Sequence, residues 1–248
     1  MLLISQTMTN ITKILLHLIL PKSSHYGTII NEVKIMAQLT AAQSGYSKKE
    51  EFLNSLSHGI GALLAIPATL FLVQKAHGEG STIELVSYII FGISMFCLYA
   101  ASTIYHAWPT HKSLLKKLDH SSIFIMIAGT YTPVALIAIG GRLGWMIFFV
   151  EWGLTVLGIV FKMYFVHRFQ RLSLLIYLGM GWLAIVFYEP MLNYITIKGF
   201  LLLLAGGLSY TIGTYFYKNK KIPYNHAIWH VFVMGGSLFM YLTIYLYM

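Results

Sequence analysis

Three histidines in apolar surroundings have the residue type and spacing to bind a metal ion. His226 and His230 are four residues apart, so on a helix both side chains stand on one face, with about 5–6 Å between their Cβ atoms. Two imidazoles at this spacing can reach one ion, and His106 from another helix would complete a set of three. Three histidines with an open fourth position are typical of catalytic zinc. The pattern favours a zinc site formed by these residues.

Asp119 and Ser102 are the candidate catalytic residues beside this set. Asp119 is the only Asp of the chain. Its carboxylate could bind the ion directly or accept a hydrogen bond from metal-bound water, and the second role suits an activated hydroxide. Ser102 lies one helical turn before His106 and could orient a ligand or a bound group. Structural explanations stay open, because a histidine can hydrogen-bond a neighbouring helix and Asp119 stands where a helix N-cap is expected.

Membrane-spanning helices are the elements that would position these residues. The chain is 57% hydrophobic and 10% charged, whereas a soluble domain has about 25% charged residues. Its apolar runs of about 18–26 residues can cross a hydrocarbon core of about 30 Å, and lipid requires each of them to be helical. We therefore predict an all-α bundle of seven transmembrane helices, at 52–75, 82–107, 119–139, 142–162, 172–189, 196–217 and 224–247.

The basic residues predict the orientation of this bundle. Fourteen of the 17 Lys and Arg residues fall in the N-terminal segment and in the second, fourth and sixth connections, to which we assign Lys112 and Lys162. The positive-inside rule then places the N-terminus in the cytoplasm and the C-terminus outside. It also explains the net charge of +9 without a nucleic-acid partner. In this topology His106, Asp119, His226 and His230 all lie near the cytoplasmic face.

The N-terminal segment differs from the rest of the chain. Its one apolar run, Ile14–Leu20, is too short to cross a bilayer. We expect residues 1–50 to form a cytoplasmic segment that is poorly ordered or interfacial, and residues 51–248 to form one transmembrane domain. Within that domain, the pairs Gly206-Gly207 and Gly235-Gly236, with Gly59 and Gly61, predict close helix contacts.

Two more polar residues would lie inside predicted spans. Glu151 falls near the middle of the fourth span, where a buried carboxylate is a functional candidate by default. We favour the alternative that it is protonated and bonded to a neighbouring helix. His58, near the inner end of the first span, could support the metal site from outside or hold helices together.

Several short motifs together carry a family resemblance. They are Glu50-Glu51 with Asn54 and Ser57-His58-Gly59, Ser-x-x-x-His at 102–106, Lys-Leu-Asp at 117–119, Ala-Gly-Thr-Tyr-Thr-Pro at 128–133 and His-x-x-x-His at 226–230. In this order they resemble the hemolysin III family, the bacterial branch of the progestin and adipoQ receptor group that includes the adiponectin receptors. The resemblance implies seven helices, a cytoplasmic N-terminus and a zinc ion bound by His106, His226 and His230. It also implies that Asp119 acts through a water, with Ser102 nearby.

Three functions remain open at this level. The first is a zinc-dependent hydrolase of an amide or ester bond in a membrane lipid, with Asp119 as general base; alkaline ceramidases support it by analogy only. The second is a non-enzymatic protein of lipid homeostasis or signalling, with structural zinc. The third is membrane lysis, the activity in the family's name. In each case we expect a multi-pass protein of the cell membrane, with membrane lipid as environment and possible substrate.

Overall fold

The described part of the chain is a single helical unit. The computed structural model describes residues 45–79, 81–166 and 168–248, and the unit runs from Ser47 to Met248. Residues 1–44, which make up most of the predicted N-terminal segment, lie outside the described residues. The division into a segment 1–50 and a domain 51–248 therefore stays a prediction.

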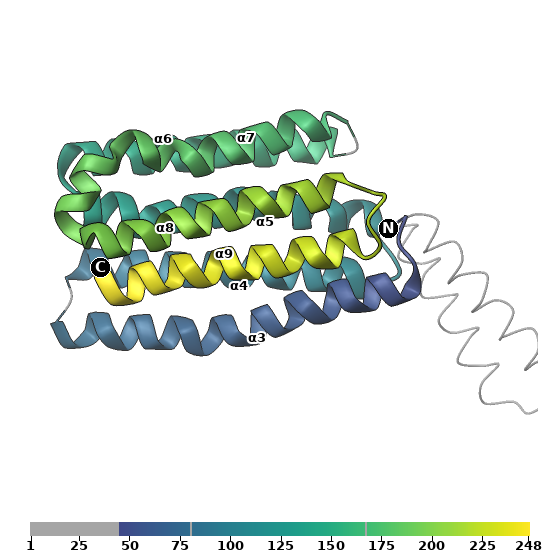
Figure 1. Cartoon of the computed structure of the whole chain (residues 1–248), viewed down its shortest axis with the longest axis horizontal. Helices are drawn as coiled ribbons and strands as arrows, with labels where there is room; N and C mark the ends of the chain where they lie inside the picture. Colours follow the sequence, from purple (N-terminus) through teal and green to yellow (C-terminus); the bar gives the residue numbers. More distant parts are fainter. Residues whose placement is uncertain (1–44, 80, 167) are drawn as a thin grey trace, which may run out of the picture. The chain divides into compact units, whose positions relative to one another are not determined.

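The helices of this unit lie side by side as a bundle (Figure 1). In chain order the elements are α3 (Lys48–Glu79), α4 (Thr82–Ala107), α5 (Lys112–Pro133), the π-helix η1 (Val134–Ile139), α6 (Gly141–Phe165), α7 (Gln170–Trp182), the 3-10 helix η2 (Leu183–Phe187), α8 (Tyr188–Lys218) and α9 (Asn225–Tyr247). No strand occurs among the described residues, which agrees with the predicted all-α class.

Six helical stretches of the described chain are long and apolar enough to cross a membrane. They are Lys48–His77, Thr82–Ala107, Lys112–Ile139, Gly141–Phe165, Gln170–Lys218 and Asn225–Tyr247. The fifth stretch has 49 residues and contains both the fifth and the sixth predicted spans. A straight helix of that length would measure about 74 Å, more than twice a hydrocarbon core.

This long stretch folds back on itself. Thr196 has φ 60° and ψ 170°, a non-helical conformation inside α8. The indole Nε1 of Trp182 in α7 donates to Thr211 Oγ1 in α8 at 3.0 Å, although the two residues are 29 positions apart. Their contact requires the chain to reverse between them, and Figure 1 shows the turn at the end where α8 begins.

The distribution of apolar and polar side chains is that of a membrane protein. Leu63, Phe149, Leu157 and Val186 leave 71%, 65%, 67% and 66% of their surface exposed. Glu151, in contrast, is fully buried at 0% exposure. Exposed apolar surface on this scale is stable against lipid and not against water. The protein is therefore a multi-pass membrane protein.

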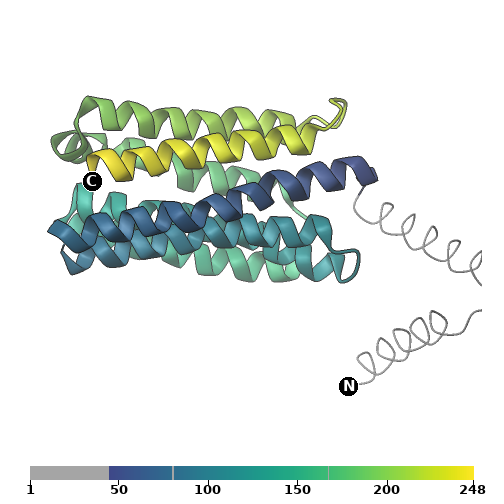
Figure 2. The same cartoon turned by 90° about the horizontal axis from the view of Figure 1, so that it is seen from below.

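Three of the glycines named from the sequence, Gly61, Gly206 and Gly236, make close helix contacts. A Cβ on Gly236 of α9 would lie 2.7 Å from the Tyr210 ring of α8, and a Cβ on Gly206 would lie 2.7 Å from Met240 Cε. Gly61 of α3 meets the Tyr99 ring of α4 in the same way, at 2.9 Å. Figure 2 shows α8 and α9 running as a close pair. These contacts fix the position of α9, which carries two of the candidate metal ligands.

The start of α5 shows that Asp119 is not a helix N-cap, which was one alternative left open by the sequence. The helix begins at Lys112, with His111 as its N-cap residue, and not at residue 119. Asp119 thus lies two turns inside the helix and is not a capping residue. The predicted span began too late because Lys112, Lys116 and Lys117 looked like loop residues, whereas the helix continues beyond the apolar run.

We expect Gly213→Val to destabilise the bundle. A Cβ at Gly213 would lie 2.7 Å from Phe232 Cβ and from the Trp229 ring of α9, so the larger side chain must push α8 away from α9. Overpacking of this kind costs about 1–3 kcal/mol. The measurement is the thermal unfolding midpoint in detergent. Gly153→Val is the matched control, because nothing lies within 4 Å of a Cβ there; equal midpoints for both variants would contradict the packing argument.

Candidate metal centre

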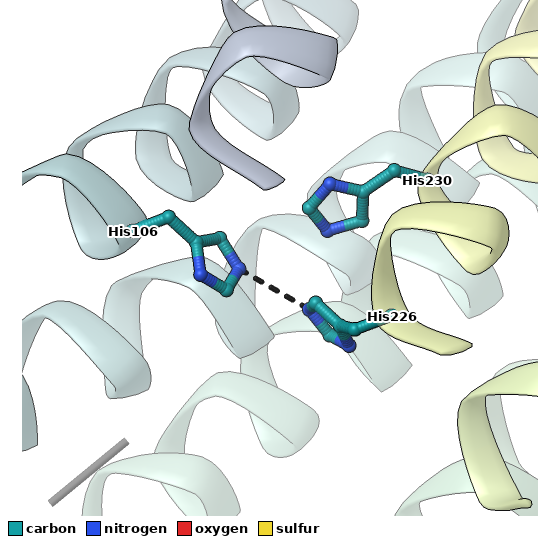
Figure 3. A group of neighbouring side chains, drawn as sticks. All are labelled: His106, His226 and His230. Atoms are coloured by element: carbon teal, nitrogen blue, oxygen red, sulfur yellow. Dashed lines mark hydrogen bonds between the residues drawn. The ribbon is translucent and has the colours of Figure 1, made fainter. Parts of the chain in front are cut away.

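The three candidate ligands come from two helices and meet inside the bundle. His106 lies in the last turn of α4, and His226 and His230 lie in the first two turns of α9. All three are buried, and one ring nitrogen of each lies within 4.8 Å of those of the others. Figure 3 shows the three rings turned toward one common point. The cluster could therefore hold a metal ion.

The spacing of two of these rings fits ligands of one ion. His226 Nε2 lies 3.2 Å from His106 Nε2 (Figure 3). Zinc–nitrogen bonds of about 2.0–2.1 Å in tetrahedral geometry place two ligand nitrogens about 3.3–3.4 Å apart. The nitrogen pair is thus already at the separation that a shared ion requires, and the all-imidazole donor set suits zinc.

Glu51 of α3 orients the His106 ring. Its Oε2 lies 2.5 Å from His106 Nδ1, and its Oε1 accepts from Lys112 Nζ at 3.3 Å. Lys112 Nζ also donates to the Tyr105 carbonyl at 2.5 Å. A proton on Nδ1 that faces a carboxylate leaves the Nε2 lone pair for the cluster. A carboxylate behind a metal-binding histidine commonly fixes the tautomer and raises the basicity of the ligand.

His230 is held by the next turn of α3 in a similar way. Its Nδ1 lies 3.1 Å from the Asn54 carbonyl oxygen and 3.0 Å from Ser57 Oγ. Since a carbonyl only accepts, Nδ1 carries the proton and donates to Asn54, and Nε2 is left to bind. In Figure 2 the first turns of α3 approach α9, which is the arrangement that these contacts require.

His58 packs against the cluster without being one of its members. Its ring stacks on that of His230, with centroids 3.6 Å apart and an interplanar angle of 11°, and meets the Tyr99 ring edge-on. It is buried and also lines the neighbouring cavity. Of the two roles considered for His58, the stacking contact favours support of the His230 ring.

Asp119 and Ser102 lie together beside the histidines. Both side chains line the cavity beside His226 and His230. Asp119 is 9% exposed and Ser102 1% exposed. The carboxylate is not a member of the three-residue ligand group. Its assigned roles, like those of the other site residues, stay predictions.

A cavity of about 140 Å³ joins the histidines to an apolar region of the bundle. At one end it is lined by Ser102, Asp119, His226 and His230. Most of the remaining wall is aliphatic or aromatic, as at Met126, Leu178, Trp182, Val233 and Met240. The volume is close to that of an engineered cavity of about 150 Å³ that accepts benzene. As it stands, the cavity admits a reacting group and a few carbons, and not a whole lipid.

The sequence missed three residues of this region. Glu51 belongs to a family motif, and its place in the first turn of a span, at the membrane face where the histidines gather, is the signal for a role at the site. The sequence predicts Lys112 and Lys162 to be loop residues, and this prediction is wrong, because their exposed fractions are 6% and 1%. Both belong to helices, α5 and α6.

Glu151 lies away from the site. Neither carboxylate oxygen has a hydrogen-bond partner among the described residues, so the expected bond to a neighbouring helix is not found there. Glu151 does not belong to the cavity wall. The structure gives it no part in the metal centre.

These observations define a class of protein: a multi-pass helical membrane protein with a buried histidine cluster between two helices and a cavity beside it. The haemolysin-III related family model matches residues 46–241, and the chain belongs to this family. It is 46% identical to "Hemolysin-3" of Bacillus cereus over 201 residues, which cover 80% of this chain and 92% of that protein.

Two further relatives extend the comparison. Identity to the "Hemolysin-3 homolog" of Bacillus subtilis (strain 168) is 47% over 205 residues, or 82% of this chain and 96% of the relative. The human "Monocyte to macrophage differentiation factor" is 27% identical over 208 residues, or 80% of this chain and 84% of the relative. The resemblance read from the sequence motifs is confirmed.

Glu51→Gln should weaken Zn²⁺ binding by about 10- to 100-fold, because the carboxylate that orients His106 is lost while the side-chain shape is kept. The measurement is competition with a chelating dye. Glu50→Gln is the matched control, since the Glu50 carboxylate accepts from the Ser47 N–H and the Glu50 N–H donates to Ser47 Oγ, in an exposed capping contact that does not involve His106. Equal affinities of the two variants would show that Glu51 does not act on the site.

Proposed function

We propose that the protein is a cell-membrane zinc hydrolase that cleaves an amide or ester bond of a membrane lipid. The observation that carries the proposal is a cluster of three buried histidines, two of which, His226 and His230, line a cavity together with Asp119 and Ser102. Three histidine ligands next to a carboxylate and a cavity leave a coordination position open to a reactant, as in catalytic zinc sites. Structural sites, in contrast, are closed by four protein ligands.

Zinc is the ion that the donor set favours. Three neutral imidazoles without a thiolate suit zinc, copper or nickel by ligand type, and tetrahedral geometry without redox chemistry favours zinc among these. His106, His226 and His230 would hold the ion. The contacts of Glu51 and Asn54 with two of the rings support this, because each directs a protonated Nδ1 away from the cluster.

The remaining residues would do the proton chemistry. A zinc ion bound in this way lowers the pKa of a coordinated water toward about 7 and polarises a carbonyl group. The Asp119 carboxylate would accept the proton of the attacking water and return it to the leaving group. Ser102, which lines the same cavity, would hold the carboxylate or the bound group in position. The apolar cavity wall would exclude bulk water and take the carbons next to the reacting bond.

The proposed topology has seven crossings, with the N-terminus in the cytoplasm and the C-terminus outside. The reversal of the chain at Thr196 supports two crossings in the stretch Gln170–Lys218. The bias of the basic residues supports the orientation. The site would then lie near the cytoplasmic face, at the depth of lipid headgroups and of the first carbons of their chains.

One observation favours a second function, a structural zinc. The ligands come from α4 and α9, and α3 touches both through Glu51 and Asn54, so an ion would tie three helices together. A non-enzymatic role in lipid homeostasis or signalling would follow. Lysis, which the relatives' name "Hemolysin-3" suggests, is the third candidate, and dye release from loaded vesicles would test it.

The roles of His106 and Asp119 separate catalysis from structure. His106→Ala should remove most of the zinc from purified protein, whereas Asp119→Asn should keep zinc and lose lipid hydrolysis by about 100-fold or more, because general-base catalysis contributes 10²–10⁴-fold. Metal content is measured by elemental analysis, and hydrolysis by fatty-acid release from a lipid panel. If Asp119→Asn loses zinc as completely as His106→Ala, Asp119 is a ligand and the site is closed and structural.

Reporter fusions should test the topology. Alkaline phosphatase fused after Gly78 or after Met248 should be active, because both points are expected outside. The same reporter after Lys221 should be inactive, as that connection carries three basic residues and is expected in the cytoplasm. An inactive fusion at Met248 would refute the odd number of crossings.

A further inference from the structure

Lys162 is the least exposed lysine that the structure describes. It belongs to the last turns of α6, and its exposed fraction is 1%. Its side chain lines the same cavity as the histidine cluster and Asp119. The proposed hydrolysis gives it no task, so its burial needs another explanation.

The ammonium group of Lys162 has no anionic partner in the described part of the chain. Its Nζ lies 5.6 Å from the centroid of the Tyr177 ring, and neither of the two carboxylate ion pairs found involves it. The charged neighbour that acts on it is Lys116, which has the same sign. Lys112, which is also buried, bonds Glu51 and the Tyr105 carbonyl. Burying an ammonium without such partners is costly unless an anion joins it.

The start of α7 adds donors to the wall of the same cavity. Gln170 is the first residue of α7 and lines the cavity, as does Ser173 one turn later. The helix has no side-chain cap at this end, so the backbone N–H groups of its first turn keep their capacity to donate. Helix N-termini attract anions through these groups and through the helix dipole. A buried cation and a helix N-terminus thus border one cavity.

Tyr177 connects this corner to the reaction region. Its ring contacts the Lys162 ammonium, and its hydroxyl donates to the His120 carbonyl at 2.8 Å. His120 follows Asp119 directly in α5. The Tyr177 side chain therefore links Lys162 to the part of α5 that carries Asp119, the proposed general base. Lys162 and Asp119 both line the cavity.

We propose that Lys162 binds the phosphate of an anionic membrane lipid whose headgroup and first chain carbons enter the cavity. The apolar wall at Leu174, Leu178 and Ile127 suits the carbons, and the ammonium with the first turn of α7 suits the phosphate oxygens. With about 140 Å³ available, the rest of the chain must extend beyond the cavity. The inference builds on the proposed function, since it names the class of substrate, but the binding itself does not need the metal.

The test uses the full chain, stripped of metal, in a neutral maltoside detergent. The probe is a long-chain alkyl phosphate with bromine on the chain, which quenches the fluorescence of Trp182 and Trp229 in the cavity wall. The wild type should show saturable quenching, and Lys162→Met should weaken it by about 10-fold or more, as expected for loss of a charged hydrogen-bond partner. Lys117→Met, at the same end of the bundle and outside the cavity wall, should bind as the wild type does.

Three comparisons make the result decisive. A brominated alcohol of the same chain length should bind equally to wild type and Lys162→Met, and Lys162→Arg should restore most of the phosphate affinity. If Lys162→Met binds the alkyl phosphate as tightly as the wild type, the proposal is wrong. It is also wrong if inorganic phosphate competes as well as the alkyl phosphate does, because the site then serves free phosphate and not a lipid.

The proposal remains testable even if Lys162→Met does not fold, because a second measurement uses the wild type alone. The alkyl phosphate should raise the unfolding midpoint more than the matched alcohol does, and equal shifts would overturn the proposal.

Experiments on the metal-loaded protein distinguish failure of the anion site from failure of the hydrolase. Phosphate-dependent binding without any lipid hydrolysis would refute the hydrolase and keep the anion site. Lipid hydrolysis by a protein that binds the alkyl phosphate no more tightly than the alcohol would refute the anion site and keep the hydrolase.

Discussion

The approach of His106 and His226 is the contact on which the rest of the site depends. Their Nε2 atoms lie 3.2 Å apart inside the bundle. The Nδ1 of His106 faces the Glu51 carboxylate and carries a proton there, so its Nε2 presents a lone pair. At this distance His226 Nε2 must either donate a proton to His106 Nε2 or bind the same cation. A metal ion shared with His230 would satisfy all three rings at once.

α3 supports this cluster without contributing to it. Glu51, Asn54 and His58 recur at spacings of three and four residues and so share one face of the helix. Glu51 reaches the ring from α4, and Asn54 and His58 reach a ring from α9. A shift of α3 along its axis would release two imidazoles at once. The position of this helix therefore sets the orientation of both imidazoles, and through them it would affect the binding of an ion.

The two buried lysines, Lys112 and Lys162, have different surroundings. The Lys112 ammonium bonds the Glu51 carboxylate and backbone carbonyls, so its charge is balanced by groups of the protein itself. Among the described residues, Lys162 has the Tyr177 ring beside it and no carboxylate partner, and it lines the cavity. Between them Asp119 stands apart from the ligand group, on a helix that donates no ligand. Separating the ligands on α4 and α9 from the carboxylate on α5 leaves room for a reactant, which supports the catalytic proposal over the structural one.

The sequence by itself determined the helical class, the approximate helix positions and the family, because bilayer thickness sets the length of an apolar run and the motifs are specific. It also indicated that His106, His226 and His230 gather at one end of the bundle, since alternating helices bring those helix ends together. It could not determine that Asp119 lies inside a helix, that Glu51 faces His106, or that Lys162 is buried. Those facts depend on the rotation of each helix about its axis and on its contacts, which are set by packing such as Gly236 against Tyr210 and not by the hydrophobicity of any one segment.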